Sequence, residues 1–111
     1  METKTTNYKR CDVVKITGRV DSATAPQLSS VLEALADAGR HRIVLDMTNL
    51  EFISSAGLRV LVNMQKTNKR HNRGEVVLAC VPKNIYNALD LVGFTILFKS
   101  FDDLLTAVGS F

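Results

Sequence analysis

Residues 46–61, DMTNLEFISSAGLRVL, constrain the fold more than any other stretch, because an apolar strand ends there and an amphipathic helix begins. Residues 42–47 (RIVLDM) form a short β-rich run of the kind that is buried on both faces of a sheet, and such strands are usually central. After the junction, one helical face is apolar (Gly57, Leu58, Val60, Leu61, Val62 and Met64) and the opposite face is polar (Arg59, Asn63, Lys66 and Arg70). The junction predicts a central strand followed by a helix that starts near Ser55.

Ser55 is well placed both to cap this helix and to carry a phosphate. A serine hydroxyl at a helix start accepts a hydrogen bond from an N–H group that has no partner within the helix. The exposed N–H groups and the helix dipole also favour a negative charge at this end. Because serines cap many helices without being modified, the position alone does not establish a phosphorylation site.

Length and composition predict one globular domain that spans residues 1–111, and the order of its strands and helices assigns it to the α/β class. The chain of 111 residues is 46% apolar and 23% charged, which is ordinary for a globular domain. Neither a signal-peptide core nor an apolar run long enough for a bilayer is present, so we expect a cytoplasmic protein without membrane insertion. Cys11 and Cys80 lie in strand-like runs without Cys-x-x-Cys spacing, which predicts reduced thiols.

Strand-like and helix-like segments alternate along the whole chain. We expect strands at residues 2–8, 11–17, 42–47, 75–81 and 94–98. Helices are expected after the caps Thr24, Ser55 and Ser100, the last in a capping box with Asp103, and at residues 85–92 before Gly93. The order ββαβαβαβα predicts a mixed, mostly parallel sheet packed with about four helices, because parallel neighbours need crossover connections.

Functional sites in such sheets form in the loops beyond the carboxyl ends of the parallel strands. Three expected loops qualify, at residues 18–23, 48–55 and 82–84, if their strands run the same way. Asp21 and Ser55 would then meet at one end of the domain. This end is the candidate functional surface.

The residues at this end do not form a recognisable catalytic set. The segment Ser54-Ser55-Ala56-Gly57 lacks the glycines of a Gly-x-Ser-x-Gly elbow, and the two histidines, His41 and His71, lie far from Ser55 in the expected fold. No phosphate-binding loop and no metal-ligand spacing are present, so we expect no enzyme activity, cofactor or metal. The net charge of +3 is only mildly basic, and the basic residues 66–74 contain no aromatic residue, which argues against nucleic-acid binding.

Three segments closely resemble the STAS domain, and within it the bacterial anti-sigma factor antagonists. They are residues 18–21 (GRVD), residues 44–46 (VLD) and residues 52–58 (FISSAGL), and the resemblance extends over nearly the whole chain. It implies a small sheet packed with about four helices. It also implies that a serine kinase, which doubles as the anti-sigma factor, phosphorylates a serine at the start of the helix after the central strand. The unmodified antagonist binds the anti-sigma factor and frees the sigma factor.

The resemblance also assigns residues. Family members commonly read Asp-Ser-Ser/Thr-Gly, and alignment on Gly57 places Ser55 at the modified serine and Ser54 at the aspartate. Ser55 is therefore the expected phosphoacceptor and Ser54 the second choice, although Ser54 lacks the negative charge that the family has beside the acceptor. The implied partner surface, together with the exposed face of the helix, comprises Asp21, Ser22, Ser54, Ser55, Ala56, Gly57, Arg59, Asn63 and Lys66.

The partners that follow are an anti-sigma factor that acts as serine-protein kinase and a serine phosphatase that reverses the modification. A weak homodimer is a further expectation. The alternative is a STAS subunit of another assembly, such as a lipid-transport complex or a signalling scaffold, in which Ser55 serves only as a helix cap.

Overall fold

The computed structural model describes residues 1–111 and contains one six-stranded mixed sheet. The strands are β1 (Glu2–Asn7), β2 (Asp12–Val20), β3 (Arg42–Asp46), β4 (Leu50–Ile53), β5 (Glu75–Ala79) and β6 (Ser100–Phe101). The α-helices are α1 (Ala25–Asp37), α2 (Ser55–Lys69), α3 (Lys83–Leu91) and α4 (Leu104–Gly109). Two short 3-10 turns, η1 (Arg70–Asn72) and η2 (Phe94–Leu97), complete the chain.

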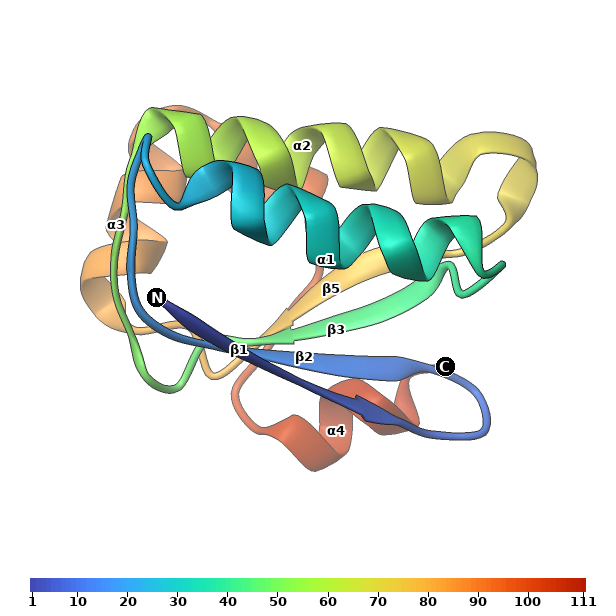
Figure 1. Ribbon diagram of the computed structural model, residues 1–111. Helices are drawn as coiled ribbons and strands as arrows, with labels where there is room; N and C mark the ends of the chain where they lie inside the picture. Colours follow the sequence, from blue (N-terminus) through green and yellow to red (C-terminus); the bar gives the residue numbers. More distant parts are fainter.

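The strands follow the order β1-β2-β3-β5-β6, and β4 pairs with β2 outside this path. Only β1 is antiparallel to its neighbour, and β2, β3, β4, β5 and β6 run parallel. Helices α1 and α2 lie side by side on one face of the sheet and α4 covers the other (Figure 1). The predicted mixed, mostly parallel sheet with four α-helices is confirmed, and the polar first strand is an edge strand as expected.

Alternation along the central strands builds a core on each face of the sheet. In β2, Val14 and Ile16 point into a cluster of 19 buried residues under α1, α2 and α3, whereas Val13 points into a cluster of six under α4. The residues of β3 and β5 alternate in the same way between the two clusters. Strands that are buried on both faces need nearly continuous apolar sequence, which is why these runs were recognisable.

A glycine follows each of two helices, and the one at Gly93 was expected. Gly39 follows α1 with φ of +80°, and Gly93 follows α3 with φ of +76°. This left-handed backbone conformation is costly for residues with a Cβ atom, so it favours glycine after a helix. No helix in the structure is both long enough and apolar enough to span a bilayer.

The prediction of a strand at residues 94–98 was wrong. This segment begins as the 3-10 turn η2, and the following strand β6 pairs with β5 at Leu78 and Ala79. The Leu97 carbonyl is bonded instead to the side chain of Gln65 on α2, at 2.7 Å. A backbone group that is satisfied by a distant side chain leaves no pattern in the local sequence.

The predicted Ser100–Asp103 capping box was also wrong, because Ser100 belongs to β6. Asp103 itself caps α4, since its Oδ1 atom accepts a 2.7 Å hydrogen bond from the Thr106 N–H. The Thr106 hydroxyl also donates a hydrogen bond to the Asp103 Oδ2 atom, at 2.9 Å. The backbone bond and the hydroxyl bond together hold the pKa of the Asp103 carboxyl below its usual value. The helix was therefore predicted correctly, with its start three residues too early.

Candidate functional site

The candidate site is built on a strand that the sequence did not reveal. Residues 48–55 were expected to be a loop, but Leu50–Ile53 forms β4, which pairs in parallel with the extended end of β2. Residues 18–20, also expected to be a loop, form that extension. Val20 pairs with Ile53, so the residues that follow these two strands lie next to each other. This pairing brings the Asp21 turn beside the serine pair, as the loop argument predicted.

The turn from β3 into β4 is shaped by Asp46, a buried carboxylate at the end of β3. Its Oδ1 atom accepts hydrogen bonds from the Thr48 N–H at 3.1 Å and from the Thr48 hydroxyl at 2.6 Å. Such bonds between a carboxylate and residues just after it stabilise tight turns. Asp46 thus has a structural role and sets the position from which β4 starts.

Ser54, and not Ser55, caps α2. The Ser54 N–H donates to the Val20 carbonyl at 2.8 Å, and the Ser54 Oγ atom accepts from the Gly57 N–H at 3.3 Å. Ser55 is the first residue of the helix, and the expectation that it would be the cap is corrected. The Ser55 side chain is exposed and takes no part in the capping bonds. Its hydroxyl therefore faces solvent at the positive end of the helix dipole.

Gly57 allows the first turn of α2 to pack directly on the ends of β2 and β4. A Cβ atom at this position would lie 2.7 Å from Cγ1 of Val20 and 2.7 Å from Cγ1 of Ile53. Both neighbours are buried branched side chains, so neither can move aside easily. Gly57 is itself buried and Ala56 is half-buried, so these two residues position the serine pair and contribute little side-chain surface.

The Asp21 carboxylate organises its own turn. Its Oδ1 atom accepts hydrogen bonds from the N–H groups of Ala23 and Thr24, each at 3.0 Å. In return, the Thr24 hydroxyl oxygen accepts a hydrogen bond from the Asp21 N–H at 2.9 Å, so the two residues are bonded in both directions. The bonds from Thr24, first the backbone and then the hydroxyl, hold the pKa of the Asp21 carboxyl below its usual value. Asp21 is a fixed negative charge at neutral pH, and the next residue, Ser22, is exposed.

Four of the predicted surface residues line one hollow beside α2. Ser55, Arg59, Asn63 and Lys66 share a depression of about 320 Å³ whose other wall includes Val92 and Phe94 from the end of α3 and from η2. Arg59, Asn63 and Lys66 are exposed, as the helical spacing predicted. The structure thus brings the serine and the polar stripe of the helix into one groove.

Two features near Ser55 could not be predicted from the sequence. They are the apolar wall of this groove and a contact between an arginine and a phenylalanine on β2 and β4. Val92, in that wall, is 51% exposed, and Leu91 and Ile96, which lie outside the lining of this groove, are each 88% exposed, which is unusual for side chains of this size. On the other side, the Arg19 guanidinium lies 4.4 Å from the centre of the Phe52 ring, a cation–π contact between β2 and β4. Recognition of β4 would have revealed this pair, since the two residues are register partners.

Neither histidine lies near Ser55, where a serine hydrolase would place its general base. His41 lies just before β3, at the opposite end of the sheet, and its Nδ1 atom contacts Oδ1 of the buried Asn68 at 2.9 Å. His71 lies in η1, beyond the far end of α2. No group of three histidine, cysteine, aspartate or glutamate side chains is arranged to hold a metal ion. Both cysteines are free thiols.

Comparison with known proteins agrees with this geometry. Residues 2–107 match the family described as STAS domain. A Bordetella bronchiseptica protein that carries the name anti-sigma factor antagonist BtrV is 37% identical over 94 residues, which cover 85% of this chain and 80% of that protein.

Solved structures share the fold at low identity. One from Thermotoga maritima, whose title names an anti-sigma factor antagonist, has a TM-score of 0.90 at 18% identity and covers 97% of this chain and 92% of that one. Bacillus SpoIIAA in its phosphorylated form has a TM-score of 0.77 at 13% identity and covers 98% of each chain, and its unphosphorylated form superposes equally well. The match over residues 2–107, together with the 37% identical relative, establishes that the chain belongs to the STAS domain family.

Proposed function

We propose that this chain is an anti-sigma factor antagonist whose binding is controlled by phosphorylation of Ser55. The observation that carries the proposal is the difference between the two serines. The Ser54 hydroxyl is committed to the Gly57 N–H, whereas the Ser55 hydroxyl is exposed at the first position of α2. The names of the relatives support the antagonist function, and the solved phosphorylated form of SpoIIAA supports a phosphorylation switch. The protein would act in the cytoplasm together with the anti-sigma factor.

The unmodified protein would bind the anti-sigma factor and release the sigma factor. In the phosphorylation step, the anti-sigma factor acts as kinase and transfers the γ-phosphoryl group of Mg-ATP to Ser55 Oγ, while its own base takes the hydroxyl proton and ADP leaves. This chain supplies the acceptor hydroxyl and its orientation. A separate serine phosphatase would restore the unmodified form.

The switch would act through charge at the interface and leave the domain folded. A phosphoserine carries about −1.5 to −2 charges at neutral pH. At the start of α2 that charge meets unpaired N–H groups and the positive end of the dipole, so the fold tolerates it. A partner surface packed against Ser55 would have to desolvate the same charge, which is unfavourable without a matching cation.

The partner surface would combine the Asp21 turn, the serine pair and the groove along α2. The hydrogen bond between Ser54 and Val20 holds the turn and the serine pair together. The groove continues from Ser55 past Arg59, Asn63 and Lys66, with the exposed Val92 on its other side. A mixed polar and apolar strip of this kind is typical of interfaces that must also remain soluble when free.

Phosphopeptide mapping after incubation with the cognate kinase and Mg-ATP tests the acceptor. We expect one phosphate on Ser55, none on the Ser55→Ala variant and unchanged stoichiometry on Ser54→Ala, which is the matched control. Full phosphorylation of Ser55→Ala would overturn the assignment.

A pull-down tests the switch and the identity of the partner. Unmodified protein should retain the anti-sigma factor, and Ser55→Asp should lose it while its thermal unfolding midpoint stays near that of the wild type. Recovery of transporter subunits by both proteins would instead favour a STAS subunit of a lipid-transport or signalling assembly. Unfolding of Ser55→Asp would show that charge acts on the fold and not on the interface.

A further inference from the structure

Two adjoining hollows mark the end of the sheet opposite to Ser55, where the parallel strands begin. One has a volume of about 220 Å³ and is lined by Lys9, Arg10, Cys11, Gly39, Arg40, His41, Arg42 and Arg73. The second, of about 530 Å³, shares Arg42 and Arg73 and adds Lys69, Asn72, Gly74, Glu75, Lys99 and Phe111. We propose that this end of the domain is a binding site for an anion with several adjacent phosphate groups.

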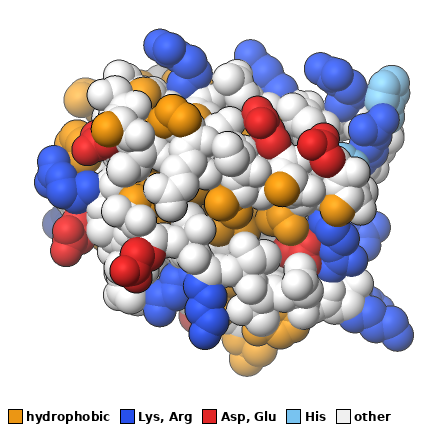
Figure 2. Space-filling model, in the orientation of Figure 1, with side chains coloured by type: hydrophobic (Ala, Val, Ile, Leu, Met, Phe, Trp, Pro, Cys, Tyr) orange, Lys and Arg blue, Asp and Glu red, His pale blue; other side chains and the backbone are white.

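The charge distribution is the first reason. Seven of the fourteen lysine and arginine side chains line these hollows, and Glu75 is the only carboxylate among the lining residues. Lysine, arginine and histidine side chains gather along the edge at which α1 and α2 end (right in Figure 2). Like charges that are brought together repel one another, so an unneutralised cluster destabilises the domain unless an anion occupies it.

Most of these cations have no acidic partner. Lys69 and Lys99 share Glu75, at 4.0 and 3.2 Å, and Arg40 pairs with Asp12 at 2.8 Å. Arg42 and Arg73, the two side chains common to both hollows, are exposed and form no salt bridge. Lys9 and Arg10, in the turn between β1 and β2, are also exposed and unpaired.

The backbone is closely packed where Arg42 and Arg73 are attached. A Cβ atom on Gly74 would lie 2.3 Å from the carbonyl oxygen of His41, so only glycine fits where the chain enters β5 beside the start of β3. Arg42 pairs with Glu75 in the sheet, and Arg73 precedes Gly74. Arg42 therefore lies on the ladder between β3 and β5, and Arg73 lies in the segment that leads into β5.

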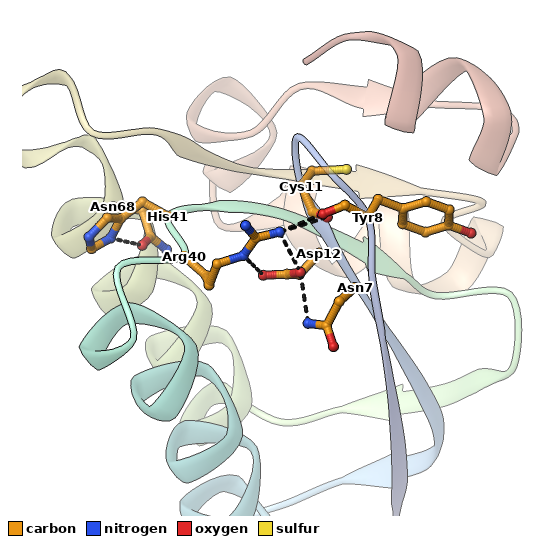
Figure 3. Close-up of polar contacts among 7 residues, drawn as sticks. All are labelled: Asn7, Tyr8, Cys11, Asp12, Arg40, His41 and Asn68. Carbon is orange, nitrogen blue, oxygen red and sulfur yellow. Dashed lines mark hydrogen bonds and ion pairs between the residues drawn. The ribbon is translucent and has the colours of Figure 1, made fainter.

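Arg40 is oriented in advance. Its Nε and Nη2 atoms donate to the two oxygens of the buried Asp12, and Nη2 also donates to the Tyr8 carbonyl at 2.6 Å (Figure 3). Its Nη1 atom makes no hydrogen bond within the protein, so it remains a donor for a ligand. A guanidinium that is already fixed loses little entropy when it binds a phosphate oxygen.

The composition of the lining decides the class of ligand. Sites for neutral organic molecules are mostly apolar, whereas each of these hollows has a single hydrophobic lining residue. Phe111 is the only phenylalanine, tyrosine or tryptophan in the lining of the two hollows, and His41 is the only other ring, so a platform for several stacked nucleic-acid bases is not present there. Planar guanidinium forks match phosphate oxygens in pairs, and a row of Arg40, Arg42 and Arg73 suits two or more linked phosphates better than one.

Calorimetric titration of the whole chain with sodium tripolyphosphate tests the site. We expect saturable binding, weakened about tenfold or more in Arg42→Gln/Arg73→Gln, because a lost charge-assisted hydrogen bond is worth about 1.5–3 kcal/mol. The matched control Lys4→Gln/Lys83→Gln removes the same charge elsewhere and should bind within about twofold of wild type, because distant exposed charges are screened. Amide NMR shifts on titration of the wild type should concentrate at residues 39–42 and 73–75, a readout that needs no variant.

The source of the phosphates is decided by a second arm with lipid vesicles that carry a multiply phosphorylated inositol headgroup. Binding of free tripolyphosphate without vesicle binding indicates a soluble anion, and vesicle binding that tripolyphosphate displaces indicates a headgroup. Both results support the proposal. Absence of saturable tripolyphosphate binding, equal loss in the two double variants, or binding of duplex DNA that tripolyphosphate does not displace would overturn it. None of these outcomes depends on the role of Ser55.

Discussion

The backbone N–H of Ser54 donates a 2.8 Å hydrogen bond to the carbonyl oxygen of Val20, and this bond joins the ends of two strands that are far apart in the chain. Val20 leads directly into the Asp21 turn, and Ser54 leads into α2. A change in the backbone position of either residue should therefore shift the other residue as well. The close packing of Gly57 against Val20 and Ile53 depends on the same junction.

Gly57→Ala should destabilise the domain, because the new methyl group would lie 2.7 Å from a methyl group of Val20 and 2.7 Å from a methylene carbon of Ile53. Overpacking of this kind costs about 1–3 kcal/mol in the free energy of unfolding. Urea denaturation measures this loss in the free energy of unfolding. Gly109→Ala is the matched control, since nothing lies within 4 Å of a Cβ atom there. That control should be neutral or slightly stabilising, because alanine favours helices. Equal stability of both variants would show that α2 can shift to accept the methyl group.

Ser54→Ala should lower the free energy of unfolding by about 1 kcal/mol, because the Gly57 N–H would lose its capping acceptor. Ser55→Ala removes an exposed hydroxyl without such a bond and should change the same quantity by less than about 0.5 kcal/mol. Thermal unfolding of the two variants side by side measures the difference. The reverse order would mean that Ser55 is the cap.

The fold was predictable where burial imposes a period on the sequence. Val13, Val14 and Ile16 alternate between two cores, so β2 was recognisable. In β4, by contrast, Leu50 and Ile53 are buried and the two residues between them are exposed. Leu50 pairs with Gly18 and Phe52 pairs with Arg19, so Glu51 is an extra residue in β4, and this irregularity breaks the alternation. A strand with that pattern cannot be distinguished from a loop by periodicity alone.

The candidate site was predictable to within one residue at its centre. Two adjacent serines are equally good helix caps by residue type, and only the end of the β4 ladder at Ile53 determines that Ser54 is used.

The lysine and arginine cluster at the end of the sheet opposite to Ser55 was missed for a different reason. Residues 66–74 form a basic segment that is visible in the sequence. Arg40, Arg42 and Lys9 are distant in the chain, and only the sheet topology brings them next to that segment. Because the amino ends of parallel strands also meet at one edge of the sheet, this cluster was predictable from the strand order.

Gln65→Leu should destabilise the domain by about 3 kcal/mol or more. The buried Gln65 carboxamide donates to the carbonyls of Val76 and Leu97 and accepts from the Val76 N–H, at 3.0, 2.7 and 2.7 Å. Each buried backbone group that is left without a partner costs about 1–3 kcal/mol. Chemical denaturation measures the loss. The matched control Gln27→Leu, on the exposed face of α1, should change stability by less than about 0.5 kcal/mol. A small effect at Gln65 would mean that water replaces the carboxamide.

Arg59→Glu should slow association with the anti-sigma factor several-fold at low salt and less at high salt. Charges at the rim of an interface act mainly through long-range attraction during the encounter. Arg59 lines the groove that contains Ser55, whereas Lys4 lies on the edge strand β1. Lys4→Glu therefore makes the same charge change outside the proposed surface. Surface plasmon resonance gives both rates, and equal association rates for the two variants would remove the helix face from the interface.

Asp12→Asn should make the domain less sensitive to acid. Burial opposes ionisation of the Asp12 carboxyl, but hydrogen bonds from Arg40 and Asn7 outweigh it and hold its pKa below the usual value. The native state then binds fewer protons than the unfolded chain, so this contribution is complete above about pH 4, the unfolded pKa, and is lost as the pH falls through the lower native pKa.

The measurement for Asp12 is the free energy of unfolding in urea at a series of pH values between 7 and 2. The wild type should lose stability steeply below about pH 4, partly because Asp21 and Asp103 also have lowered pKa values and titrate in the same window. Asp12→Asn lacks one of these groups, so it should be less stable at pH 7 and show a shallower slope below about pH 4. Asp37→Asn, at an exposed carboxylate without a salt bridge, should keep the wild-type slope. A slope that is unchanged by Asp12→Asn would show that Asp12 binds protons equally in the native and unfolded states, so that its hydrogen bonds with Arg40 and Asn7 do not contribute to acid unfolding.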